Sequence, residues 1–241
     1  MFDDEGTAMK TSPEASGRKG SSDAASSTAY SLLREEIVAG RFEPEAKLRV
    51  EELCERYKIG ASPMREALSR LAETGLVVSE PNRGYWLAPV SVEEYQDLIA
   101  QRLALEPRAL ADAIRHGDIE WEAQVLAAHH RLSRAHAKLD GTEESFVAWA
   151  REDRAFHAAT LSRCSSPWLL RFCALVSSQL SRYHRQRYLT GIKPGDQTER
   201  EHDALLKAIL TRDVDLAVAC LTKHITAVAR RLVKDDLPST G

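Results

Sequence analysis

The stretch LRVEELCERYKIGASPMREALSRLAETGLV, residues 48–77, decides the fold of the N-terminal part of the chain. Apolar residues at helical spacing predict two short helices here, and Gly60 is expected to end the first of them. We expect the second helix to begin after Ser62, because serine can cap a first turn and Pro63 suits the first helical position. Its inward stripe would be Met64, Ala67, Leu68 and Leu71.

The flanking segments extend this helix pair into a larger unit. Upstream, a helical pattern of apolar residues begins at Thr28 and ends at Gly40. Downstream, LVVSEPNRGYWLAP, residues 76–89, contains two short β-type runs around a Pro-Asn-Arg-Gly turn. Three helices followed by a hairpin predict a winged helix-turn-helix over residues 28–90. Residues 1–27 are rich in small polar and charged residues without an apolar period, which predicts a disordered tail.

The predicted winged helix carries candidate contacts to double-stranded DNA. The first turn of a recognition helix enters the major groove, so Arg65 is the leading candidate for a base contact, with Ser62 beside it. Phosphate or minor-groove contacts are predicted for Arg49, Arg70 and Arg83. The alternative is that Arg65 and Arg70 are solvated charges paired with neighbouring glutamates. Residues 28–90 hold nine Lys or Arg against ten Asp or Glu, so DNA binding must come from where the charges lie.

The remainder of the chain has a different pattern. From Val92 onward almost every segment has helical periodicity, with breaks near Gly117, Gly141, Pro167 and Gly191. Residues 91–234 therefore predict an all-α bundle of six or seven helices, and residues 235–241 a short tail. The fold class expected for the whole chain is mainly α.

Composition limits the class of protein. With 43% hydrophobic and 29% charged residues, the 241-residue chain is typical of a soluble globular protein of one or two domains. No run approaches the roughly 18 apolar residues that span a bilayer, and no secretory signal begins the sequence, so we expect a cytoplasmic protein without membrane contact. The four cysteines lack C-x-x-C spacing, which favours small buried side chains over disulfides or a zinc knuckle.

Four ionisable residues fall on or beside core-facing stripes of the predicted bundle. Asp153 and His157 lie one helical turn apart, while His202 and His224 accompany apolar stripes of two later helices. Burying such groups alone is costly, so they should have partners. Convergence of one carboxylate and three imidazoles predicts a divalent metal site, with zinc first and nickel, manganese or iron as alternatives. Taken singly, each histidine is more often structural.

Arginines add a second clue. Arg102 lies on an apolar stripe, and a buried guanidinium needs an anion. That anion is either Glu106, one turn on, or the carboxylate of a small effector held between Arg102 and the metal. Further along the chain, Arg182, Arg185 and Arg187 suggest a contact to a second carboxylate, with an exposed basic helix face as the favoured explanation.

The N-terminal motifs resemble a known family. Residues 48–77 followed by PNRGYWLAPVS, residues 81–91, closely resemble the DNA-binding domain of GntR-type transcription regulators. The resemblance implies DNA contacts at Arg49, Arg65 and the wing around Arg83 and Gly84. Many members carry arginine where this chain has Ala61, so their operators do not transfer to it.

The helical part resembles the FCD ligand-binding domain of the FadR-like branch of this family. Four runs match in order and spacing: RLALEPRALADAI, EDRAFHAATL, EHDALLKAIL and ACLTKHI. The resemblance implies a metal held by Asp153, His157, His202 and His224, an arginine signature at Arg102, and a homodimer that represses until an organic acid binds. Other segments, such as IGASPMREALSRL and SRYHRQRY, are similar to a subgroup that senses a short dicarboxylate such as glutarate.

Two other classes of protein remain open at this point. A metal-dependent hydrolytic enzyme with an accessory winged helix could use the same four ligands to activate water. A protein-interaction module could use the winged helix as a scaffold. Against catalysis, the sequence contains no nucleophile elbow, P-loop or dinucleotide fingerprint.

Overall fold

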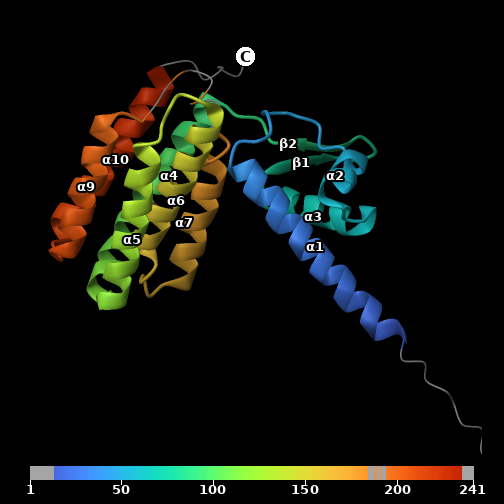
Figure 1. Ribbon diagram of the computed structural model, residues 1–241, viewed down its shortest axis with the longest axis horizontal. Helices are drawn as coiled ribbons and strands as arrows, with labels where there is room; N and C mark the ends of the chain where they lie inside the picture. The colour runs from blue at the N-terminus through green and yellow to red at the C-terminus, as the bar shows by residue number, and fades with distance from the viewer. Residues whose placement is uncertain (1–13, 184–187, 189–190, 192–193, 235–241) are drawn as a thin grey trace, which may run out of the picture.

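The computed structural model describes residues 14–183, 188, 191 and 194–234. Figure 1 shows two domains side by side, which confirms the expected mainly helical architecture. The N-terminal domain consists of α1 (Glu14–Val38), α2 (Val50–Tyr57), α3 (Ala61–Glu73), β1 (Val77–Glu80) and β2 (Gly84–Leu87). The C-terminal bundle has six helices among the described residues: α4 (Val92–His116), α5 (Ile119–His136), α6 (Glu143–Leu161), α7 (Pro167–Leu180), α9 (Asp196–Leu210) and α10 (Val214–Lys234).

The first helix is longer than the sequence pattern predicted. Its described part begins at Glu14, so the prediction of a disordered tail over residues 1–27 is wrong for its second half. Ser26 and Ala29 are each 1% exposed, and the Ser26 hydroxyl donates to the Glu66 carboxylate of α3 at 2.9 Å. Small side chains allow α1 to pack closely on α3, but they leave almost no apolar period. Residues 1–13 and 235–241 lie outside the described residues.

The turn between α2 and α3 differs in detail from the prediction. Lys58, in the left-handed conformation at φ 56°, ends α2 in place of Gly60. Gly60 instead occupies the extended N-cap position of α3, which therefore starts at Ala61. Ser62 consequently lies inside the first turn and makes no capping hydrogen bond. The shift leaves Ser62 exposed at the start of the helix predicted to enter the groove.

Apolar burial holds the N-terminal domain together. Leu33 of α1 packs with Met64, Leu68 and Leu71 of α3, all with 0% exposure, in one core. Each such side chain contributes about 1.5 to 3 kcal/mol when fully buried. The antiparallel wing pairs Val77 with Leu87 and Glu80 with Gly84. The backbone at Lys47 adds a bridge to Trp86 at the wing's edge.

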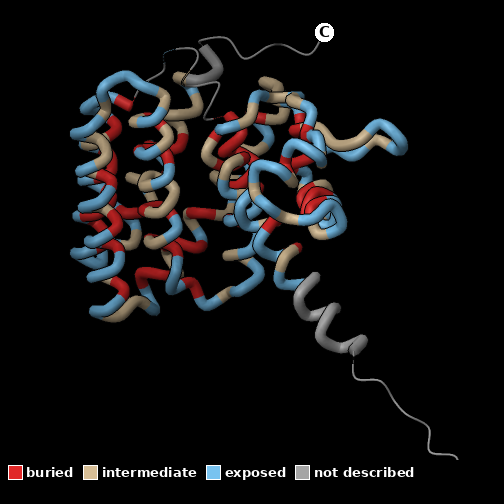
Figure 2. Tube along the Cα trace, turned by 45° about the vertical axis from the view of Figure 1, so that its right-hand side comes forward, coloured by how far each residue is buried: buried red, intermediate tan, exposed pale blue. Residues whose placement is uncertain are grey.

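Four helices of the bundle, α4 to α7, begin at a residue whose side chain caps the first turn. The side chains that accept a backbone N–H at a helix start are Ser91 of α4, Asp118 of α5, Thr142 of α6 and Ser166 of α7. Each cap stabilises its helix by about 1 kcal/mol. The core is filled by large side chains, including Trp121, Trp149, Phe156 and Tyr183. In Figure 2, buried and exposed stretches alternate along the helices of the bundle, as expected for helices with one face in the core.

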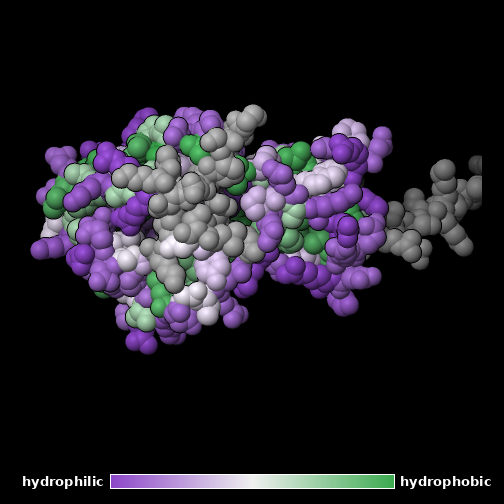
Figure 3. Space-filling view, turned by 90° about the horizontal axis from the view of Figure 1, so that it is seen from above, coloured by the Kyte–Doolittle hydropathy of each residue, from purple (hydrophilic) through white to green (hydrophobic). Residues whose placement is uncertain are grey.

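The outer surface is mostly polar. In Figure 3, hydrophilic side chains dominate the visible face of both domains, with hydrophobic ones scattered among them. Within the described part of the chain, no helix combines the length and apolar character needed to cross a membrane. All four cysteines are free; Cys164 and Cys173 are buried as expected, whereas Cys54 and Cys220 are only half-buried.

Residues at and just beyond the end of α7 contact the start of α4, the linker and the N-terminal domain. Arg182 is only 3% exposed and binds the Pro89 carbonyl oxygen and, at 2.6 Å, the Glu94 carboxylate. The Tyr183 hydroxyl lies 2.6 Å from the same carboxylate, and Gln179 donates to the Thr74 carbonyl oxygen at 2.5 Å. The expected exposed basic face is therefore wrong for Arg182, which is an internal clamp. Arg185 and Arg187 lie outside the described residues.

Candidate functional site

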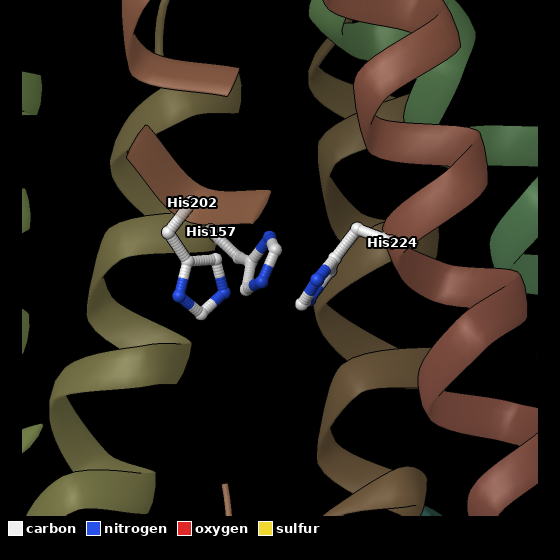
Figure 4. Close-up of side chains that lie close together, drawn as sticks. All are labelled: His157, His202 and His224. Atoms are coloured by element: carbon white, nitrogen blue, oxygen red, sulfur yellow. The ribbon is translucent and has the colours of Figure 1, made fainter. Parts of the chain in front are cut away.

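Three histidines from three helices meet inside the bundle. His157 of α6, His202 of α9 and His224 of α10 are 7%, 2% and 3% exposed. Their ring centroids lie 4.5 to 5.4 Å apart, and one nitrogen from each falls within 4.8 Å of the others. Figure 4 shows the three rings turned toward one shared space. The structure thus brings together three side chains that sequence spacing could place only on separate stripes.

Asp153 lies at the edge of the cluster, beside two of the three histidines. Its Oδ1 atom lies 3.3 Å from His202 Nε2 and 4.0 Å from His157 Nε2. Asp153 lies one turn before His157 on α6, and its side chain is 15% exposed. The three imidazole nitrogens are ligands of the kind that zinc and similar divalent ions prefer, and the Asp153 carboxylate lies close enough to two of the rings to be a candidate fourth ligand.

Two of the histidines, His157 and His202, are in the neutral form that binds metal. The pKa of His157 lies well below its usual value, mainly because the ring is buried. Burial is also the main reason why the pKa of His202 is lowered to about 3. Both rings are therefore neutral near pH 7, as ligands must be. Neither ring nitrogen of His157, nor Nε2 of His202, has a hydrogen-bond partner among the described residues. Buried polar atoms without partners are costly, and a bound cation would satisfy them.

A second carboxylate orients His224. Nδ1 of His224 lies 3.0 Å from Glu201 Oε2, and Glu201 is itself 8% exposed. Burial opposes ionisation of Glu201, yet hydrogen bonds from His224 and Gln197 lower its pKa to about 2. The ionised carboxylate thus accepts the Nδ1 proton and leaves Nε2 available for a ligand bond. Sequence reasoning missed Glu201, although it shares an inward stripe with Thr198 and Leu205.

Arg102 lies beside this cluster but already has an anion. Its Nε donates to Glu106 Oε1 at 2.9 Å, so the internal ion pair foreseen as one alternative is present. Arg102 also lines a cavity of about 40 Å³ together with Asp153, His224 and Tyr183. That volume holds only a few water molecules, so a dicarboxylate would enter only if the wall moved.

The candidate DNA contacts lie on the N-terminal domain. Arg65 and Ser62 are exposed on the first turns of α3. Arg49 is exposed before α2 and is paired with Glu52 at 2.8 Å. Arg83 is exposed at the tip of the wing, followed by Gly84 at φ +113°. These candidates are therefore exposed polar side chains of α3, of the residue before α2 and of the tip of the wing.

Arg70 differs from these residues. Its guanidinium lies 4.4 Å from the centroid of the Tyr30 ring, where it links α3 to α1. A cation over an aromatic face contributes about 0.5 to 2 kcal/mol. Arg70 therefore has a structural contact in addition to its predicted role at phosphate.

Comparison with known proteins identifies both domains. Residues 25–86 match the model described as bacterial regulatory proteins, gntR family, and residues 97–227 match the FCD domain. The regulator BphR of Paraburkholderia xenovorans is 36% identical over 81% of this chain and 80% of its own length. The transcriptional repressor GlaR of Escherichia coli is 33% identical over 81% of this chain and 90% of its own length.

A solved structure shares the fold. E. coli McbR/YncC superposes with a TM-score of 0.78 over 87% of this chain and 97% of that one, at 21% identity. The relatives are transcription regulators, which decides against the hydrolase alternative. The chain therefore belongs to the GntR family of bacterial regulatory proteins, in the branch with an FCD domain, and is a DNA-binding transcription regulator, not an enzyme.

Proposed function

We propose that this regulator is a homodimeric repressor whose DNA affinity depends on a divalent metal and a small organic acid. The observation that carries the proposal is the buried cluster of three histidines and Asp153 in the domain next to a winged helix. Relatives named as repressors include GlaR and the galactonate operon repressor of E. coli, which is 24% identical over 83% of this chain.

The metal would be held by Asp153, His157, His202 and His224, with zinc as the first expectation. When bound, the ion would offer an open coordination position to a carboxylate oxygen. Arg102 would hold the effector's carboxylate from the opposite wall, in exchange for part of its contact with Glu106. A short carboxylate suits this site best, because the cavity between Arg102 and His224 is narrow.

A series of side-chain contacts links this cavity to the DNA-binding domain. Tyr183 lines the cavity and binds Glu94 at the start of α4. The neighbouring Arg182 holds the linker at Pro89, and Gln179 holds the N-terminal domain at Thr74. Displacement of Tyr183 by an effector would therefore move the linker. The effector can shift the equilibrium between two orientations of the DNA-binding domain only by as much as its affinities for those two orientations differ.

DNA recognition in this proposal follows the polar surface around α3. Arg65 and Ser62 would contact base edges, while Arg49, Arg70 and the wing at Arg83 and Gly84 would contact the backbone. A homodimer would place two such surfaces on a palindromic operator. Its formation is supported by an unpartnered apolar face of α7, where Trp168, Phe172 and Leu175 are 64%, 49% and 44% exposed.

Two measurements on the full chain test the proposal. The first is DNA affinity, measured by fluorescence anisotropy with a duplex that the wild-type protein selects from a random library. Arg65→Ala should lose roughly tenfold or more in affinity, since a bidentate base contact contributes about 1 to 3 kcal/mol. Arg200→Ala, on the exposed side of α9, is the matched control and should bind as the wild type does. Equal affinity of Arg65→Ala and wild type would contradict the assignment.

The second measurement is metal content, by elemental analysis together with native mass spectrometry of the purified protein. His202→Ala should lose most of its metal and its response to added organic acids while retaining part of its DNA binding. His130→Ala, on the exposed side of α5, should retain the wild-type stoichiometry. Full metal occupancy in His202→Ala would overturn the proposed metal site.

A further inference from the structure

A second and much larger cavity lies between the two domains. Its volume is about 930 Å³, within the usual range for small-molecule sites. One wall is α1 of the DNA-binding domain, and the other is formed by α6 and α7 of the FCD domain. The small cavity beside Arg102 and His224 is lined by a different set of residues, although His157 and Glu106 border the large one.

Three arginines from both walls gather in this cavity. Arg34 comes from α1, and Arg151 and Arg154 come from α6. Burial lowers the pKa of Arg154 to about 10; the charge of Asp153 opposes this, and those of Arg34 and Arg151 add to it. Glu35 and Glu106 also line the cavity, and Arg151 is paired with Glu152 at 2.8 Å, so carboxylates offset part of this positive charge. Three guanidinium groups that line one cavity would attract an anion placed among them.

The rest of the lining is mainly apolar. Val38 of α1, Leu161 of α6 and Leu170 of α7 face the cavity, and small alanines at 155, 158 and 174 leave room between them. A simple inorganic anion would leave this apolar surface in contact with water. An anion with an apolar body would cover it and gain about 25 cal/mol for each Å² removed from water.

We propose that the interdomain cavity is a second ligand site for a monoanionic organic acid with an aromatic or similarly bulky apolar body. Its anionic group would lie among Arg34, Arg151 and Arg154, and its body along Leu161, Leu170 and the alanines. The ligand bridges α1 and α6, so it acts on the pose of the DNA-binding domain directly. This goes beyond the proposed function, because the site requires both domains and no metal.

The test uses 1-anilinonaphthalene-8-sulfonate as the probe, an aromatic body with one sulfonate. Binding to the full-length protein is followed by fluorescence and calorimetry, both with chelator and with zinc. We expect one site per protomer. Arg34→Met, which removes a cation, and Ala174→Trp, which fills the cavity, should each weaken binding by about tenfold or more. The control Arg200→Met should stay within about twofold.

Two further measurements make the result decisive. Zinc binding by Arg34→Met should equal that of the wild type, so failure of this site is distinguishable from failure of the metal site. The probe should change the affinity of the wild type for its selected duplex, but not that of Arg34→Met. The proposal is overturned if Arg34→Met and Ala174→Trp bind the probe as the wild type does. It is equally overturned if binding is lost only in Phe172→Ser, which would place the probe on the outer face of α7.

Discussion

Replacing His157 by leucine should change the stability of the protein in opposite directions with and without metal. His157 is 7% exposed, and both of its ring nitrogens lack a hydrogen-bond partner among the described residues. An unsatisfied buried polar group costs about 1 to 3 kcal/mol. Leucine has a similar volume and no polar atom, so His157→Leu should stabilise the metal-free protein by roughly that amount. The midpoint of thermal unfolding should then rise by about 2 to 4 °C per kcal/mol.

With zinc present the order should reverse. A ligand that binds only the folded state at a hundred times its dissociation constant stabilises it by about 2.7 kcal/mol. The wild type gains this stabilisation, whereas His157→Leu has lost one of four proposed ligands and gains much less. The two proteins should therefore exchange their ranking between chelator and zinc.

The assay is thermal unfolding of wild type, His157→Leu and the exposed control His130→Leu, each in chelator and in a zinc series. His130→Leu should follow the wild type in both conditions. The reasoning is refuted if His157→Leu melts below the wild type in chelator and still gains the full stabilisation from zinc. That outcome would mean that the imidazole is satisfied in a way that the structure does not account for.

Three other substitutions test separate parts of the structure. Leu68→Ala should lower the free energy of unfolding of the N-terminal domain by about 2 to 5 kcal/mol, measured by urea denaturation, because it leaves a cavity in a core with 0% exposure. Glu201→Gln should weaken zinc binding by about 10- to 100-fold, because it removes the charge that orients His224. Zinc affinity is measured by competition with a chromophoric chelator, and Glu199→Gln, on the same helix, is the control. Trp168→Ser should raise the concentration at which dimers form in analytical ultracentrifugation, because it removes the most exposed side chain of the α7 face; an unchanged sedimentation profile would place the dimer contact elsewhere.

Local patterns predicted much of the fold. The inward stripe of α3, the hairpin after Gly75 and the helical bundle all follow from residue periodicity, which depends only on the geometry of a single helix or strand. Apolar periodicity did not predict the start of α1, where small residues make the packing contacts. The first helix extends well before Thr28, because close approach of α1 to α3 uses serine and alanine and not an apolar stripe.

For the candidate site, too, the sequence predicted some relations between residues and the tertiary structure decided the others. Sequence alone determined that Asp153 and His157 share a face of one helix, and that His202 and His224 accompany inward stripes, since those relations need only the helical repeat. Only the tertiary structure decided that α6, α9 and α10 bring the three rings within 4.8 Å, that Arg102 is paired with Glu106, and that a wide cavity lies between the domains. Distances between helices depend on how all the side chains of the core fill space together, and no local repeat in the chain encodes that.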